Sequence, residues 1–395
     1  MKPITSSRER MLAALNCETP DHPPCSFMIF GALHQNSVSY LEFLENQLDL
    51  GLDTFVELPP RPPLVRNDTY NLHGLPVSYH PDVWEEESIT KPVGGAAPLM
   101  RKIYHTPVGD LTAEVRQTDD WRWGDHVPFL DDYLIPRSIK FIVEGPKDLP
   151  AFQYLLIPPT DKEVAAFKAT SAPYLDFARE HDLLVAGGWG VGADMIGWVH
   201  GLNTLVYDIF DQPEFVRDLL GMIADWNRSR MQVVLDEGVD LYIKRAWYEN
   251  ADFFTPTSWR ELILPELQRD AALAHQAGAK FGYIITARTM PLLDLIAEAG
   301  VDVLIGVDPE AFDLALTKEK LKGKVCLWGG VNGHLTVEHG EAADVAREVR
   351  TALKELGPDG FILSPVDNIR EDTPLAIDNA MALIHTWQEE TGQAI

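Results

Sequence analysis

Four ionisable side chains stand within or shortly after short apolar runs of the sequence. Glu57 lies near the end of one such run, and Glu249, Asp367 and His34 follow others. A carboxyl group in a site closed to water has a raised pKa and can donate a proton, and an imidazole can act as a base or as a metal ligand. We therefore take these four as candidate catalytic residues. Their spacing matches no metal-binding motif, so a divalent metal such as zinc is left open.

Aromatic and polar residues occupy the same kind of position and form a candidate substrate-binding set. Its members are Trp189, Trp247, Tyr283, Arg288, Asp308, Trp328, Asn332 and Asn368. The tryptophans could form an apolar wall for a methoxy-bearing substrate or an aromatic cage for a quaternary ammonium, and Arg288 has the fork geometry to hold a carboxylate. Each large aromatic could equally cap the core of the fold.

The apolar runs are strand candidates that alternate with segments of helical periodicity. They are apolar throughout, which is typical of parallel strands covered on both faces. Eight can be counted, at 24–30, 54–58, 183–188, 241–246, 280–286, 301–307, 325–330 and 361–364. This pattern predicts an α/β fold, a (β/α)8 TIM barrel, whose active site would lie at the carboxyl ends of the strands. A doubly wound parallel sheet is the alternative.

Three further features complete the predicted organisation. An N-terminal helical extension precedes the first strand, and the Pro-rich and Trp-rich stretch 61–150 is predicted to be an insertion after the second strand, with a β-hairpin around 106–111. The whole chain, 1–395, is then one domain. At 258–261 the sequence Ser-Trp-Arg-Glu predicts a capping box that opens a helix running to about Gln276.

Composition limits the classes of partner. The chain has 33 Lys and Arg against 60 Asp and Glu, a net charge of −27, which disfavours nucleic acid and anionic membrane surfaces. Three scattered cysteines form no disulfide framework, and neither a secretory signal nor a membrane-spanning run is visible. These features predict a soluble, cytoplasmic protein.

Several short segments, in order along the chain, carry a family resemblance. They lie at 7–15, 20–24, 106–109, 187–189, 277–280, 291–294, 299–302, 327–330 and 373–374. Together they resemble the uroporphyrinogen decarboxylase superfamily, which also contains corrinoid-linked methyltransferases. The resemblance implies a (β/α)8 barrel with a deep cleft at the strand ends. It also explains the glycines of 187–192 as a strand-to-helix turn better than as a phosphate-binding loop.

The positions that carry chemistry in the decarboxylases are changed in this chain. No arginine occurs at 27–34, where their paired-arginine motif would fall, and their tyrosine, serine and histidine fall on Gly197, Ala246 and Asp367. Only the acidic residue of the second strand is retained, as Glu57. Uroporphyrinogen itself is therefore not the expected substrate.

The methyltransferases' thiolate zinc motif, a His-x-Cys pair followed by a distant Cys, is also missing, because those positions read Ile-Ile-Thr at 284–286 and Pro-Val-Asp at 365–367. The resemblance then implies a substrate-side methyltransferase that demethylates a small methoxy or N-methyl compound and passes the methyl group to a corrinoid on a partner protein. The alternatives are a decarboxylase or lyase of a small carboxylate held by Arg288 or Lys244, and a non-catalytic binding protein. A homodimer is also possible.

Overall fold

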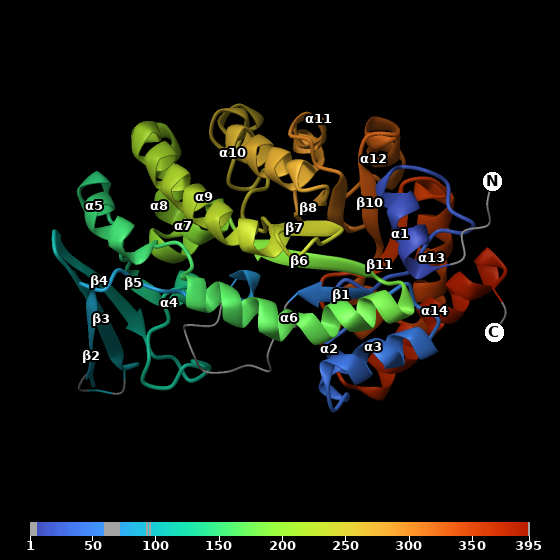
Figure 1. Ribbon diagram of the computed structural model, residues 1–395, viewed down its shortest axis with the longest axis horizontal. Helices are drawn as coiled ribbons and strands as arrows, with labels where there is room; N and C mark the ends of the chain where they lie inside the picture. The colour runs from blue at the N-terminus through green and yellow to red at the C-terminus, as the bar shows by residue number, and fades with distance from the viewer. Residues whose placement is uncertain (1–5, 59–71, 92–93, 95, 394–395) are drawn as a thin grey trace.

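The computed structural model describes residues 6–58, 72–91, 94 and 96–393, and its centre is a curled parallel sheet (Figure 1). Seven strands follow one another in chain order: β1 (Phe55–Leu58), β6 (Leu184–Gly190), β7 (Leu241–Arg245), β8 (Lys280–Ile284), β9 (Val303–Val307), β10 (Cys326–Asn332) and β11 (Phe361–Val366). Every pair of neighbours is parallel. The predicted α/β class and parallel sheet are confirmed.

The predicted first strand, 24–30, takes a less regular form. It makes two isolated parallel bridges to the β11 side of the sheet, Cys25 with Leu363 and Ile29 with Asn368. On the β1 side, the N–H of Asp53 donates to the carbonyl of Cys25 at 2.8 Å. The segment therefore contacts both ends of the seven-strand sheet, although the described residues contain only seven strands in that sheet.

Helices cover the convex side of the sheet (Figure 1). The longer ones are α1 (Ser7–Leu15), α3 (Tyr40–Asp49), α6 (Asp161–His181), α8 (Leu202–Asp211), α9 (Pro213–Leu235), α10 (Pro256–Gln276), α12 (Leu314–Leu321), α13 (Ala342–Leu356) and α14 (Pro374–Thr391). The shorter ones are α2 (Gly31–Gln35), α4 (Leu134–Arg137), α5 (Leu149–Phe152), α7 (Ala193–Val199) and α11 (Leu293–Glu298). Short 3-10 turns lie at Leu72–Gly74, Pro146–Asp148, Gln153–Leu155 and Met290–Leu292, and a π-helical turn, η5, spans Gly333–Glu338.

The alternation of side chains along each strand divides the core in two. Residues such as Phe55, Ile243, Ile305 and Trp328 form an inner core enclosed by the curled sheet. Their sequence neighbours pack outward against the helices in a larger outer core. Helix α1 adds Met11, Ala14 and Leu15 to the inner core.

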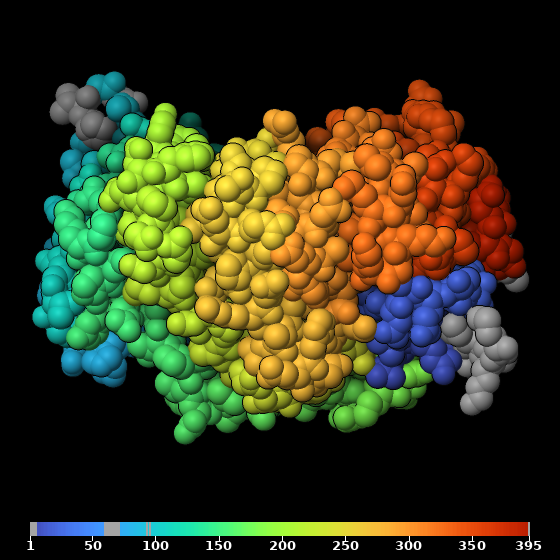
Figure 2. Space-filling model, turned by 90° about the horizontal axis from the view of Figure 1, so that it is seen from above, coloured from blue at the N-terminus to red at the C-terminus, as the bar shows by residue number. Residues whose placement is uncertain are grey.

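A second, antiparallel sheet lies at the end of the molecule away from both termini (Figure 1). Its strands are β2 (Trp84–Thr90), β3 (Leu99–Thr106), β4 (Gly109–Arg116) and β5 (Ser138–Lys140). Strands β3 and β4 form a hairpin closed at Thr106 and Gly109, which confirms the predicted hairpin. In the space-filling view from above, the colours of the chain run in order from this sheet to the C-terminal helix (Figure 2). The limits 61–150 for an insertion within one domain stay a prediction.

None of the helices within the described ranges combines the length and apolar character that crossing a membrane requires.

Candidate functional site

A pocket at the carboxyl end of the parallel sheet brings together four of the predicted residues. We call it the central pocket. It is lined by Trp189, Trp247, Trp328 and Asp367 together with Met28, Ile29, Ile284, Thr286, Ile305, Gly306, Gly329, Ser364, Pro365 and Val366. The walls are apolar, and Asp367 is the one ionisable residue among them. A pocket of this kind suits a small ligand with an apolar or cationic group.

Backbone and side-chain contacts fix the indole rings of the central pocket. The indole N–H of Trp328 donates to the carbonyl of Ser26 at 2.9 Å, and its ring meets Phe55 edge to face. Trp189 lies in the left-handed region at φ +62°, and its ring centroid is 6.3 Å from that of Trp247. Since the left-handed region is unfavourable for a bulky side chain, the surrounding structure must hold Trp189 in place.

Trp247 is held by an ionic network that sequence reasoning missed. The Arg245 guanidinium lies 4.0 Å from the Trp247 ring centroid. Arg245 also pairs with the buried Asp194 at 3.0 Å and with Asp132 at 3.2 Å. Asp194 in turn accepts the N–H groups of Trp247 and Tyr248. Burial raises the pKa of Asp194 and outweighs the opposing effect of Arg245.

Asp367 and Asn368 play different parts at the turn after β11. Asp367 is exposed, has φ +68° and accepts the N–H of Asn368 at 2.9 Å. The side chain of Asn368 instead accepts the N–H of Gly31 at 3.0 Å, where α2 begins. Asn368 does not line the central pocket, and its hydrogen bond connects the turn after β11 to the end of the 24–30 segment, so its substrate contact stays a prediction.

His34 and Glu57 share a second cavity, the side pocket, which also includes Tyr40, Phe43, Gln47 and the segment 27–31. Met28 and Ile29 border both pockets. Glu57 is half-buried at the end of β1, and its N–H donates to the Tyr40 hydroxyl at 2.8 Å. The two predicted catalytic residues, His34 and Glu57, therefore lie next to the central pocket, and Met28 and Ile29 lie between the two pockets.

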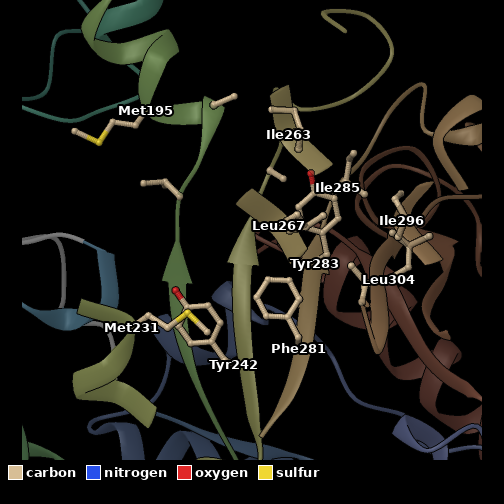
Figure 3. Close-up of a cluster of buried hydrophobic side chains, with 14 of the residues drawn as sticks. Met195, Met231, Tyr242, Ile263, Leu267, Phe281, Tyr283, Ile285, Ile296 and Leu304 are labelled. Carbon is tan, nitrogen blue, oxygen red and sulfur yellow. The ribbon is translucent and has the colours of Figure 1, made fainter. Parts of the chain in front are cut away.

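Glu249 and Tyr283 line neither pocket, and their catalytic and substrate-binding roles stay predictions. Glu249 is buried, accepts the N–H of Ala193 at 2.7 Å, and accepts a hydrogen bond from the Tyr283 hydroxyl. Tyr283 belongs to the outer core, between β8 and α10 (Figure 3). Burial raises the pKa of Glu249, although the neighbouring Lys244 acts against this.

Lys244 is committed to a buried ion pair rather than to a ligand. Its ammonium lies 2.7 Å from Asp270 of α10, which also pairs with Arg228 at 3.1 Å. Lys244 is directed outward from the inner core, since its neighbour Ile243 is directed inward. The sequence carries one sign that Asp270 is buried. It is a charged residue on the otherwise apolar face of the helix α10.

Three more of the predicted substrate-binding residues line neither pocket and have other partners, so their substrate contacts stay predictions. Arg288 is 75% exposed in its side chain, lines neither pocket, and has Asp252 as its ion-pair partner at 3.8 Å. Asp308 and Asn332 bind each other, with both carboxylate oxygens 3.0 Å from the Asn332 amide nitrogen. The carbonyl oxygen of the Asn332 side chain caps the following turn by accepting the N–H of Leu335. Polar residues after strands often serve as caps, and here they do so.

The residues at the carboxyl end of the sheet do not fit a thiolate zinc centre. The corresponding positions, including Ile284, Thr286 and Asp367, line the central pocket without sulfur. The three cysteines lie elsewhere: Cys25 and Cys326 are buried, Cys17 follows α1, and none lines the central pocket.

The fold and the pocket define a class of α/β protein with its candidate site at the carboxyl end of a curled parallel sheet. Residues 184–389, more than half of the chain, match the family model described as uroporphyrinogen decarboxylase (URO-D). The chain belongs to this family.

A solved structure that covers nearly the whole chain shows the same fold at low sequence identity. A methyltransferase from Methanosarcina mazei is 17% identical, with a TM-score of 0.60, and the match covers 98% of this chain and 99% of that one. A B12-independent methionine synthase from Shewanella sp. W3-18-1 is 13% identical, with a TM-score of 0.37 over 57% of this chain and 65% of that one. No curated protein sequence matches the chain.

Proposed function

We propose that this chain is a methyltransferase that takes a methyl group from a small N-methyl or methoxy compound in the central pocket. A corrinoid on a partner protein would receive it. The observation that carries the proposal is the convergence of three indole rings and one carboxylate on a single pocket. Indole faces attract cations, and a carboxylate adds to that attraction. An N-methylammonium compound is therefore the donor that suits the pocket best.

The chemistry of the donor determines what the protein must supply. When bound, the corrinoid cobalt supplies the electron pair that accepts the methyl group. A quaternary ammonium leaves as a neutral amine and needs no proton. An ether leaves as an alkoxide that must take a proton from an acid. Asp367 in the central pocket and Glu57 in the side pocket are the candidate acids for an ether, since Glu249 lies away from both.

A carboxylate substrate is less well supported. A decarboxylase or lyase needs a cation to hold its substrate, yet among the described residues that line the two pockets there is no lysine or arginine. Lys244 is paired with Asp270, and Arg288 lies at the surface. If the Arg288→Lys and Lys244→Met variants keep the lyase activity of the wild type, neither cation holds the substrate, and the alternative loses its support.

The same proposal treats the curled sheet as a (β/α)8 barrel, with 24–30 as the eighth strand and 61–150 as an insertion within one domain. The two bridges to the β11 side and the Asp53–Cys25 hydrogen bond support the position of that strand. Assembly as a homodimer stays a prediction.

The proposal is tested by incubating the purified chain with cob(I)alamin and following the visible spectrum for methylcobalamin. Tetramethylammonium, trimethylamine and methoxybenzene serve as donors. We expect the ammonium donor to react best. Trp247→Ala should raise KM for it roughly tenfold or more, because a desolvated cation–π contact is worth about 2 kcal/mol. Asp367→Asn should raise the same KM.

Trp84→Ala is the matched control, because Trp84 is an exposed tryptophan on the antiparallel sheet, far from the central pocket. It should leave KM unchanged. If the chain binds tetramethylammonium but transfers no methyl group to cobalamin or to a corrinoid protein, the result would instead support a non-catalytic binding function. Turnover of a carboxylate without corrinoid would support a lyase.

A further inference from the structure

A second cluster of chemically active side chains lies in the π-helical turn after β10. His334, Glu338 and His339 place one ligand atom each within 4.8 Å of the others. No residue of this cluster lines the central or the side pocket. The proposed methyl transfer does not use it, so it needs its own explanation.

The wide turn of η5 accounts for the convergence of these side chains. In a π-turn the backbone hydrogen bond joins residues i and i+5, so both the fourth and the fifth following residues lie near the first. The His334 and His339 rings accordingly meet edge to face, with centroids 4.6 Å apart.

The distances suit a transition-metal ion. His334 Nδ1 and Glu338 Oε2 are 3.0 Å apart. Two tetrahedral ligands with zinc bonds of about 2.0–2.1 Å are roughly 3.3 Å apart, so an ion could replace the proton that they now share with only a small shift. Two imidazoles and one carboxylate favour zinc or cobalt over magnesium or calcium, which prefer oxygen ligands.

Glu338 is the buried member of the cluster. Its side chain is 1% exposed, whereas that of His334 is 59% exposed, so the cluster is open to solvent on one side. Hydrogen bonds with His334 and with the N–H groups of Arg370 and Glu371 fix the orientation of the Glu338 carboxylate. The group is therefore an oriented carboxylate, as metal ligands with hydrogen-bonded outer partners are.

We propose that His334, Glu338 and His339 form a binding site for a divalent transition-metal ion such as Zn²⁺, with three protein ligands and an open fourth position. The ion also fixes the loop after β11. Glu338 Oε1 accepts the N–H groups of Arg370 at 2.6 Å and Glu371 at 3.1 Å, a few residues after Asp367 of the central pocket. This site is independent of the proposed function.

The test uses the full chain, freed of metal with a chelator and dialysed. Co²⁺ is added while the visible d–d absorption is recorded, and Zn²⁺ binding is measured by titration calorimetry. We expect one ion per chain, bound at about 10 µM or tighter. His334→Ala and His339→Ala should each weaken binding at least tenfold. Since both side chains are exposed, these variants should fold normally.

His385→Ala is the matched control, because His385 is exposed on α14 and belongs to no such cluster. It should bind the ion as the wild type does. The site is ruled out if the wild type binds no Co²⁺ or Zn²⁺ in this range, or if the His334→Ala/His339→Ala double variant binds equally well.

Hydrogen exchange tests the effect on the loop separately. Zn²⁺ should slow exchange at the amides of Arg370 and Glu371 in the wild type and leave it unchanged in the double variant. Bound zinc without this slowing would overturn the proposed link between the ion and the loop.

Discussion

Glu249 is a carboxylate that the fold separates from both pockets, and this gives it a structural role. Its two oxygens accept hydrogen bonds from the Ala193 N–H and the Tyr283 hydroxyl, and Lys244 lies nearby. Glu249→Gln would place an amide donor against one of these donors and remove one of the two carboxylates that act on Lys244, which keeps its ion pair with Asp270. We expect the free energy of unfolding in urea to fall by about 1–3 kcal/mol.

The control at this scale is Glu261→Gln, an exposed position on α10 that should change the free energy of unfolding by less than about 0.5 kcal/mol. A Glu249→Gln protein as stable as the wild type, but about 10²-fold slower in methyl transfer, would restore the acid–base role that the sequence predicts.

The sequence places polar residues at strand ends correctly but does not show which way each side chain is directed. Strands that are apolar on both faces carry no alternation, so nothing in the sequence separates the inward Trp328 from the outward Tyr283. Burial alone does not distinguish them either, because both are fully buried. Partners distant in sequence, such as Arg245 and Asp132, are equally invisible without the fold.

Gly190, the last residue of β6 before the turn to α7, packs closely against buried side chains. A Cβ added at Gly190 would lie 2.0 Å from the Tyr242 hydroxyl and 2.8 Å from Asn227 Oδ1, both of which are buried. Gly190→Ala should therefore force these side chains apart and lower the free energy of unfolding by about 1–3 kcal/mol, measured by urea denaturation.

Gly221→Ala within α9 is the matched glycine control. A Cβ there meets nothing within 4 Å, so this change should stabilise the protein by about 0.5–1 kcal/mol through helix propensity. If the Gly190→Ala and wild-type proteins are equally stable, the space around Gly190 is larger than the structure shows, and the prediction is wrong.

Helix and turn positions were predictable where local chemistry decides them. The helix of 256–276 ends at Gln276 as expected, but Thr255 caps its start instead of the predicted Ser258. Thr255 precedes a proline at the first helical position, which is a better start signal than the internal Ser258. The glycines of 187–192 form the expected turn only in part, because Gly187, Gly188 and Gly190 lie within β6 and Gly192 lies between β6 and α7.

At the scale of the whole molecule, the succession of strands and helices was readable because each apolar run is short and bounded by a helix. The sequence could not show that the 24–30 segment is irregular, because its two bridges are to residues on the β11 side of the sheet, more than 300 residues away in the sequence. Its neighbour Asp53, just before β1, ties this segment to the N-terminal helix by accepting the Cys25 N–H and pairing with Arg10.

This contact between distant parts of the chain predicts a specific dependence of stability on pH. Burial raises the pKa of Asp53 to about 6, despite the opposing effect of Arg10. The folded state therefore binds this proton more tightly than the unfolded state, and the resulting stability is full below about pH 4 and lost by about pH 6. The free energy of unfolding of the wild type, minus that of Asp53→Asn, should fall by about 3 kcal/mol over this interval.

Urea denaturation of both proteins between about pH 4 and pH 7 measures this difference. Asp378→Asn is the matched control, because it removes a carboxylate at an exposed position on α14. If the difference for Asp53 instead rises with pH, the ion pair with Arg10 outweighs burial, and the N-terminal helix is held to the curled sheet by a charged pair at neutral pH. The expected fall in this difference means that the packing of Met11, Ala14 and Leu15 in the inner core holds the N-terminal helix in place. The charged Asp53 carboxylate then destabilises the folded state.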